Sequence, residues 1–229
     1  MRAPLSVIIP TLNSADALPD CLGALIEGLQ AGIIRELVIS DGGSSDATKP
    51  IAEDAGAIFV VGAASRGGQL ARGASAAQGD DAGWLLFLHS DTVLPAGWSA
   101  LVGNHMANAT NPAYFHLAFD ATGLAPKLVA GWANLRARLF GLPYGDQALL
   151  ISRADYRAAG GFPDIPLMED VALMRALTSR PVALAASVKT SAARYETAGW
   201  LRRGVRNLWT LIRYLCGADP HALARSYRR

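Results

Sequence analysis

Short apolar runs alternate with stretches of helical periodicity through the first 90 residues, and this alternation constrains the fold more than any other feature. The runs are rich in β-branched and aliphatic residues and cover residues 5–9, 36–40, 57–61 and 84–88. Helical segments are expected after the first three runs, over about residues 16–31, after Ser45-Asp46, and over residues 68–77. Strands that alternate with helices build a parallel sheet covered by helices. The sequence therefore predicts an α/β fold with a Rossmann-like, mostly parallel central sheet and helices on both faces.

The pattern is less regular in the second half of the chain. A helix is expected to begin near Pro95, and strands are predicted over residues 114–119, 148–152 and 181–186. Further helices are predicted over residues 124–140, around Ala154, over residues 169–177 and 198–216, and after Pro220. No stretch is rich enough in Gly, Ser or Pro to mark a linker, so we expect residues 1–229 to form a single domain.

The composition indicates a packed globule whose function sits in a pocket. Hydrophobic residues make up 51% of the 229 residues and charged residues 17%, which excludes an extended disordered chain. The net charge of +2 does not indicate nucleic acid as a partner. Two cysteines are too few for a disulfide framework, and no signal-peptide-length apolar stretch stands near the N-terminus. We therefore expect a cytoplasmic protein.

Polar residues follow the predicted strands, at the sheet edge where open parallel sheets bind ligands. Taken loop by loop, they are Pro10, Thr11 and Asn13; Asp41, Gly43 and Asp46; Arg66; and Ser90 and Asp91. Four loops are therefore expected to face one site, although polar residues scattered over turns would look similar. In the second loop, a carboxylate at Asp41 can accept hydrogen bonds from a nucleobase or a ribose, and its glycines allow close backbone approach. The loop matches neither a Walker motif nor a Rossmann fingerprint.

The fourth loop, His89-Ser90-Asp91, places a carboxylate directly after an apolar strand. Asp91 could hold Mg²⁺ or Mn²⁺, with diphosphate oxygens and water as the other ligands. The cation would offset the charge of a diphosphate leaving group. His89 is either a second ligand or a buried core histidine, and Asp91 either a ligand or the cap of the next helix.

Three segments together resemble the family 2 glycosyltransferases of the GT-A fold. They are residues 7–13 (VIIPTLN) with 41–46 (DGGSSD), residues 87–91 (FLHSD) and residues 167–170 (LMED), in the family's order and spacing. The resemblance implies metal-dependent, inverting transfer of a sugar from a nucleotide diphosphate sugar, with a UDP-sugar favoured, to a hydroxyl acceptor. It divides the chain into a nucleotide-binding half (1–95), a half for the donor sugar and acceptor (96–195), and basic amphipathic helices (196–229).

Residue roles follow from the same resemblance. Nucleotide binding is implied for Pro10, Thr11, Asn13, Asp41, Gly43, Arg66 and Ser90. The family's Asp-x-Asp motif reads His89-Ser-Asp91 here, so the metal-binding carboxylate is kept while the first carboxylate is replaced by histidine. Asp170 of the Glu169-Asp170 pair is the expected general base, with Glu169 as second choice, because an attacking hydroxyl must lose its proton. Alternatively, the pair only complements a helix N-terminus.

Two further segments resemble a bacterial branch of this family associated with radical enzymes or arsenosugar biosynthesis. They are residues 144–147 (YGDQ) and 160–163 (GGFP). Asp146 and Gln147 are expected to bind the donor sugar or the acceptor, unless the segment is only a turn into the next strand. The Gln-x-x-Arg-Trp motif of processive synthases is missing, which favours transfer of single sugars.

The last long helix is amphipathic and basic. Its apolar stripe consists of Leu201, Val205, Leu208, Trp209, Ile212 and Leu215, with arginines off the stripe. Eight arginines against two acids follow from Arg194 onward. The helix either packs on the domain, attaches peripherally to the inner face of a membrane near a lipid-linked acceptor, or forms a homodimer. If the helix does not bind a membrane, the acceptor is expected to be a small molecule instead of a lipid-linked one.

Two other functions stay open. A nucleotidyltransferase would share the metal and nucleotide sites, but we expect it to carry a glycine-rich basic loop where residues 11–14 read TLNS. A membrane-associated nucleotide-binding protein that has lost catalysis would account for His89 and for the basic final helix.

Overall fold

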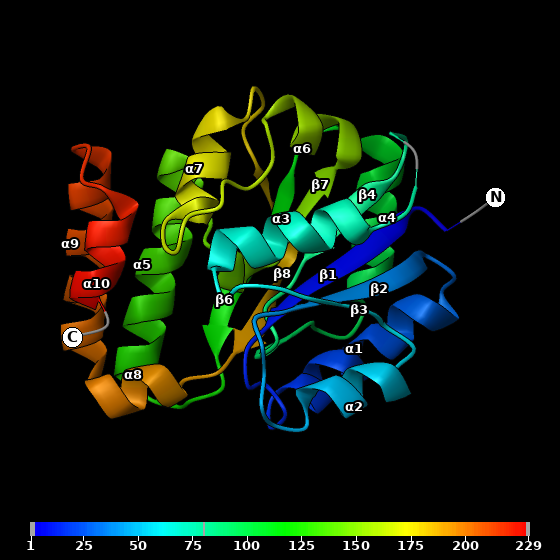
Figure 1. Ribbon diagram of the computed structural model, residues 1–229. Helices are drawn as coiled ribbons and strands as arrows, with labels where there is room; N and C mark the ends of the chain where they lie inside the picture. The colour runs from blue at the N-terminus through cyan, green and yellow to red at the C-terminus, as the bar shows by residue number, and fades with distance from the viewer. Residues whose placement is uncertain (1–2, 80, 228–229) are drawn as a thin grey trace.

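A central sheet of eight strands organises the computed structural model, which describes residues 3–79 and 81–227 (Figure 1). The strand order is β3-β2-β1-β4-β7-β6-β8-β5. β7 is antiparallel to β4 and β6, β5 is antiparallel to β8, and the other pairs are parallel. The strands are β1 (Leu5–Thr11), β2 (Ile34–Asp41), β3 (Ile58–Val61), β4 (Trp84–Phe87), β5 (Thr92–Val93), β6 (Ala113–Phe119), β7 (Leu149–Ser152) and β8 (Val182–Thr190). The predicted mostly parallel α/β sheet is confirmed.

Helices cover both faces of this sheet because its strands are apolar on both sides. Along β1, Val7 and Ile9 pack on one face and Ile8 on the other. The first face is covered by α1, α2, α4 and α5, and the second by α3 and α7. The helices are α1 (Leu18–Gln30), α2 (Thr48–Asp54), α3 (Arg66–Ala76), α4 (Trp98–Asn108), α5 (Leu124–Phe140), α6 (Arg153–Ala158), α7 (Glu169–Ala176), α8 (Ala193–Ala198), α9 (Trp200–Leu215) and α10 (Pro220–Tyr227), with a 3₁₀ turn η1 (Gly145–Gln147).

Some elements differ from their approximate predicted bounds, and the structure gives the reason in three cases. α3 begins at Arg66, two residues before the expected start, because the Ser65 hydroxyl accepts a hydrogen bond from the Gly68 N–H and caps the helix. β8 extends to Thr190 because it pairs with β6 along the whole of that strand. The helix predicted over residues 198–216 is α9, which begins at Trp200 because Gly199, with a φ of +83°, separates it from the unpredicted α8.

Candidate active site

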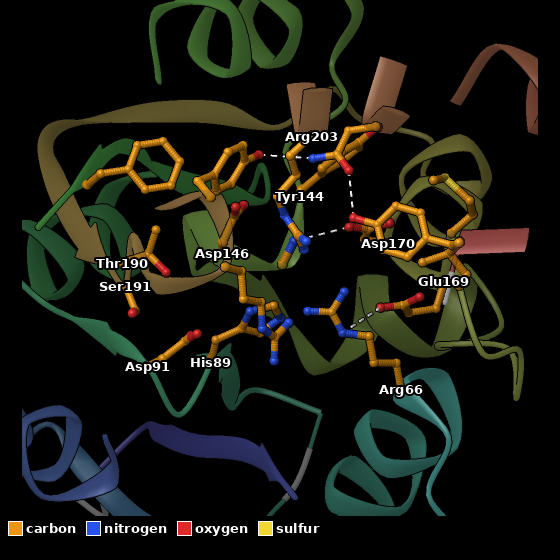
Figure 2. A pocket seen from close by; sticks show the side chains of 18 residues that line it. Arg66, His89, Asp91, Tyr144, Asp146, Glu169, Asp170, Thr190, Ser191 and Arg203 are labelled. Carbon is orange, nitrogen blue, oxygen red and sulfur yellow. Dashed lines mark hydrogen bonds and ion pairs between the residues drawn. The ribbon is translucent and has the colours of Figure 1, made fainter. Parts of the chain in front are cut away.

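Two adjoining hollows lie beyond the carboxyl ends of the central strands. We call the first the strand-end hollow; it is lined by residues that include Pro10, Thr11 and Ser90. The second, the main pocket, lies among η1, the start of α7, the end of β8 and helices α8–α10. The two hollows share four of their lining residues: Arg66, His89, Asp91 and Arg194. Asp91 and the Glu169–Asp170 pair lie on opposite sides of the main pocket in Figure 2.

The loop after β2 is organised by the carboxylate of Asp41, which is almost wholly buried. It accepts hydrogen bonds from the Thr11 hydroxyl at 2.9 Å, from the Ser44 hydroxyl at 2.5 Å, and from the N–H groups of Gly43 and Ser44 at 2.7 and 2.6 Å. Burial alone would raise the pKa of Asp41, but these hydrogen bonds outweigh it and lower the pKa. The ionised Asp41 thereby fixes Thr11 at the wall of the strand-end hollow.

Some of the predicted nucleotide-binding residues line the strand-end hollow, and the others lie in the loops behind it. Pro10, Thr11, Arg66 and Ser90 line the strand-end hollow. Asp41, Asn13 and Gly43 line neither hollow. Asn13 has a φ of +50° and accepts a hydrogen bond from the Ser45 N–H at 2.9 Å, so it joins the first loop to the second. A ligand contact for these three residues stays a prediction.

Arg66 is positioned by close packing between the start of α3 and the loop before α7. The Gly67 N–H donates to the Ile165 carbonyl at 3.1 Å, and a Cβ atom at Gly67 would lie 1.9 Å from the Pro163 carbonyl oxygen. The Ser65 hydroxyl donates to the Asp164 carboxylate at 2.6 Å. These contacts explain why glycine follows Arg66: a side chain there would separate the two segments. Arg66 thereby comes close to the acidic start of α7.

The start of α7 holds two carboxylates in different environments. Glu169 is buried, and its Oε1 lies 3.9 Å from Nε of Arg66 (dashed in Figure 2), while its Oε2 has no hydrogen-bond partner among the described residues. Burial, and then the neighbouring Asp170, raise the pKa of Glu169 to about 7 against the opposing effect of Arg66. Asp170 accepts hydrogen bonds from the N–H groups of Gly145 at 3.1 Å and Val171 at 2.7 Å. Asp170 is therefore held facing the pocket by backbone groups.

The turn at residues 144–147 forms another wall and rests on a buried arginine from α5. The guanidinium carbon of Arg136 lies 3.4 Å from the centre of the Tyr144 ring, and Arg136 also donates to the Leu142 carbonyl and to Oε1 of Gln147. Asp146 lines the main pocket with a buried Oδ1 that has no hydrogen-bond partner among the described residues. Burial raises the pKa of Asp146 to about 6. This carboxylate is therefore available to a ligand.

The prediction that Gln147 binds substrate needs correction. Gln147 has no exposed surface. Its amide nitrogen donates to the Phe115 carbonyl and to Asn134, and its amide oxygen accepts from Arg136 and from the Tyr144 N–H. Gln147 therefore holds the turn in place from beneath, and only Asp146 of the predicted pair reaches the pocket.

His89 lies against the same turn. A Cβ atom at Gly145 would lie 2.5 Å from Nε2 of His89, so only glycine permits this approach. Burial, followed by the positive charges of Arg66 and Arg194, lowers the pKa of His89 far below its usual value. The imidazole is therefore neutral at physiological pH and adds no charge beside Asp91.

Backbone strain concentrates around the two hollows. Among the described residues, positive φ values outside glycine occur at Asn13, at Ala148 directly after Gln147, and at Met168 directly before Glu169. Such conformations cost of order 1–3 kcal/mol each and persist where the surrounding structure enforces them. All three residues adjoin segments that the sequence predicts to be functional.

Several lining residues were not predicted as part of the site. Arg194 lies where the two hollows meet, and Tyr144, Arg203, Asn207 and Tyr227 line the main pocket. The sequence offered a partial signal, because Arg194 opens the arginine-rich section and Arg203 and Asn207 are four residues apart on one amphipathic helix. Nothing local shows that this helix folds back over the sheet edge.

Solved structures with the same architecture define the fold class. Glucosyl-3-phosphoglycerate synthase from Mycobacterium tuberculosis, in complex with Mn²⁺ and UDP-glucose, matches 94% of this chain and 80% of its own at a TM-score of 0.59 and 20% identity. TarS from S. aureus, residues 1–349, matches 96% of this chain and 68% of its own at a TM-score of 0.60 and 17% identity. The architecture is that of the GT-A glycosyltransferases.

Sequence comparison adds the family. Residues 6–114, just under half of the chain, match Glycosyl transferase family 2. Relatives from Mycobacterium bovis and Mycobacterium tuberculosis, described as PGL/p-HBAD biosynthesis glycosyltransferases, are 36% identical in an alignment of 118 residues that covers 46% of this chain. The aligned region spans 44% of the length of these relatives. The resemblance to family 2 glycosyltransferases is thus confirmed, while the arsenosugar-associated branch stays a prediction.

Proposed function

We propose that the protein transfers a sugar from a nucleotide diphosphate sugar, with a UDP-sugar favoured, to a hydroxyl acceptor. The observation that carries this proposal is the meeting of the two hollows at Asp91, with Arg66 and Arg194 beside it. A nucleoside in the strand-end hollow would bring its diphosphate between two guanidinium groups, which suit phosphate oxygens. The sugar would then extend into the main pocket. In support, synthase structures sharing this fold contain UDP with Mn²⁺ or Mg²⁺.

A divalent cation fits the residues that are present, provided that it arrives with the nucleotide. Among the described residues, no group of three or more His, Cys, Asp or Glu side chains is arranged to hold a metal. Asp91 supplies one carboxylate, and Mg²⁺ in nucleotide sites commonly takes one or two carboxylates with phosphate oxygens and water. Asp91 would hold the cation, with the neutral His89 as a second candidate. When bound, the cation would stabilise the negative charge of the departing diphosphate.

Asp170 is the proposed general base. It lies on the side of the main pocket opposite Asp91, and its two backbone hydrogen bonds fix the carboxylate while leaving lone pairs for an acceptor hydroxyl. An acceptor between Asp170 and the sugar would lose its proton to Asp170 as it attacks, which favours inversion. Glu169 is the second candidate, but its ion pair with Arg66 favours a positioning role. Asp146 is proposed to bind the sugar or the acceptor.

A thermal-shift panel tests this function. The full chain is heated with UDP, GDP, UDP-glucose and UDP-galactose, each with and without Mn²⁺. A ligand that binds only the native state raises the apparent melting temperature by mass action. We expect uridine nucleotides with Mn²⁺ to give the largest increase. Equal, small shifts with every nucleotide, unaffected by Mn²⁺, would contradict the proposal and favour a protein without this donor site.

A further inference from the structure

Helices α5 and α9 lie side by side at one end of the molecule, next to α10 (Figure 1). Val129 and Trp132 of α5 face Gly204 and Leu208 of α9 across a narrow cavity. The two helices therefore form a layer with one side toward the sheet and the main pocket and the other toward solvent.

The solvent side of this layer is apolar. α5 exposes Leu124, Leu128, Trp132, Leu135 and Leu139, and α9 exposes Leu201, Val205, Leu208, Trp209, Ile212 and Leu215. Exposure is high: 71% for Leu128, 78% for Leu201 and 60% for Trp209. We call these eleven residues the α5–α9 face. Single exposed apolar residues need no explanation, but a contiguous set across two helices marks a surface that binds a partner.

Packing on the domain, one of the three alternatives for this helix, accounts for only one side of α9. Leu211 and Thr210 are its buried residues, and Arg203 and Asn207 line the main pocket, so one side of the helix does pack. The apolar stripe predicted from the sequence lies on the other side. Its residues are the exposed ones, so the hydrophobic periodicity of α9 is not explained by the core of this chain.

The charged residues of α5, α9 and α10 have one sign, while the exposed acids Glu196 and Asp219 lie beyond the two ends of α9. The segments that form α5, α9 and α10 contain no Asp or Glu. Exposed cations lie on the same helices, at Lys127, Arg138, Arg202 and Arg225. An apolar stripe with aromatic residues and a cationic border is the arrangement that amphipathic helices use at anionic lipid surfaces.

We propose that the α5–α9 face binds the surface of an anionic lipid bilayer. The apolar side chains would enter the boundary between headgroups and acyl chains, with Trp132 and Trp209 at the interface and the arginines against lipid phosphates. In the described ranges, no helix is long and apolar enough to cross a membrane.

A second copy of the chain fits this face less well. In a two-fold dimer each patch meets its own copy, so the cationic borders of α5 and α9 would face one another. No carboxylate on α5, α9 or α10 is available to pair with them, and like charges across an interface oppose association. A bilayer with phosphatidylglycerol supplies the missing negative charge.

Docking at a bilayer would also place the membrane next to the candidate active site. Arg203 and Asn207 line the main pocket from the same helix that carries Val205 and Trp209 on the face. The helical layer thus separates the pocket from the bilayer by the width of one helix.

Vesicle flotation tests the proposal on the full chain without any substrate, so its outcome is independent of the transfer activity. We expect co-flotation with vesicles of equal parts phosphatidylglycerol and phosphatidylcholine, and much weaker flotation with phosphatidylcholine alone. Added salt should weaken the binding, since exposed charges are screened. Equal binding to both vesicle types, or none to either, would overturn the proposal.

Matched variants locate the surface. Val205→Asp and Leu128→Asp should each lower vesicle partitioning about tenfold or more, because each puts a charge where an apolar side chain would enter the bilayer. Ile26→Asp, at an exposed apolar position on α1, should leave it unchanged. Arg202→Gln should weaken binding to anionic vesicles, whereas Lys49→Gln on α2 should not.

Sedimentation velocity without lipid tests the alternative that a second copy of the chain binds this face, because it measures whether the protein is a monomer or a dimer. A dimer that Val205→Asp dissociates, combined with no flotation of the unmodified chain, would overturn the bilayer assignment in favour of a second copy. A monomer that floats with anionic vesicles supports the assignment. Circular dichroism of each variant confirms that lost binding does not come from unfolding.

Discussion

The backbone N–H of Gly145 donates a hydrogen bond to Oδ2 of Asp170 at 3.1 Å, and so joins the turn before β7 to the start of α7. The same glycine lies against His89, because a Cβ atom on it would come 2.5 Å from Nε2 of that ring. One small residue thus links the proposed base to the loop that carries Asp91. The turn at residues 144–147, the start of α7 and the loop that carries Asp91 thus meet at Gly145. A change in one of these segments is therefore expected to affect the other two.

Replacing the proposed base should abolish transfer and spare nucleotide binding. Asp170→Asn keeps the side-chain shape but cannot accept the acceptor's proton. We expect kcat to fall by about 10²- to 10⁴-fold, the usual contribution of general base catalysis. The UDP-induced thermal shift with Mn²⁺ should stay close to that of the unmodified protein. Asp54→Asn, at the exposed end of α2, serves as the control. Full turnover by Asp170→Asn would remove that residue from the mechanism.

Metal-dependent nucleotide binding should depend on Asp91 and much less on His89. Titration calorimetry with UDP and Mn²⁺ measures both. Asp91→Asn is expected to lose the Mn²⁺-dependent part of UDP binding, whereas His89→Asn should keep it, because Mg²⁺ and Mn²⁺ prefer carboxylate oxygen to imidazole nitrogen as a ligand. Mn²⁺ without UDP should bind weakly to all forms, since a single carboxylate cannot complete its coordination. The reverse order of the two variants would make His89 the principal ligand.

The sheet was predictable because β1, β2 and β4 are apolar runs of strand length, separated by helical periodicity. The strand-end loops were predictable for the same reason, because polar residues at the ends of parallel strands must meet at one edge. Glu169 and Asp170 were found only through a resemblance, since nothing local distinguishes a catalytic pair from acidic residues in the first turn of a helix.

Other features depend on long-range packing and left little trace in the sequence. Gln147 is polar and adjoins Asp146, so the sequence grouped them, yet Gln147 points beneath the turn because its amide meets Phe115, Asn134 and Arg136. Arg194 reaches the junction of the hollows only because β8 extends to Thr190 and delivers α8 there. Such placements arise from the pairing of β6 with β8, which sequence periodicity does not specify.

Stability should depend on pH through Glu169. Its pKa is raised from 4.5 to about 7 in the folded protein, mainly by burial, so the folded state holds a proton that the unfolded chain releases earlier. This contribution is fully present below about pH 4.5 and is lost as the pH rises through 7. Relative to the unmodified protein, Glu169→Gln should therefore gain stability between these values, by up to about 3 kcal/mol. Urea unfolding at several pH values measures the difference.

The same urea unfolding series on Asp146→Asn should show a stability gain over a different pH range. The pKa of Asp146 rises from 3.8 to about 6, also mainly by burial. The relative gain of Asp146→Asn should therefore develop between about pH 3.8 and 6, and so end at a lower pH than the gain of Glu169→Gln. Two difference curves that do not change with pH would show that neither carboxyl group is perturbed by burial.

The packing of α3 against the loop before α7 should be sensitive to a single methyl group. Gly67→Ala would place a Cβ atom 1.9 Å from the Pro163 carbonyl oxygen, which is backbone and cannot rotate away. We expect a loss of about 1–3 kcal/mol in unfolding free energy, the usual effect of overpacking, as the two segments separate. Arg66 would move with α3, so the UDP-induced thermal shift should shrink as well. Gly23→Ala is the matched control, because its Cβ would meet nothing within 4 Å and α1 should gain up to about 1 kcal/mol from the better helix former. Equal stability of the two variants would show that the start of α3 has room to move, and Arg66 would then be held by its ion pair with Glu169 alone.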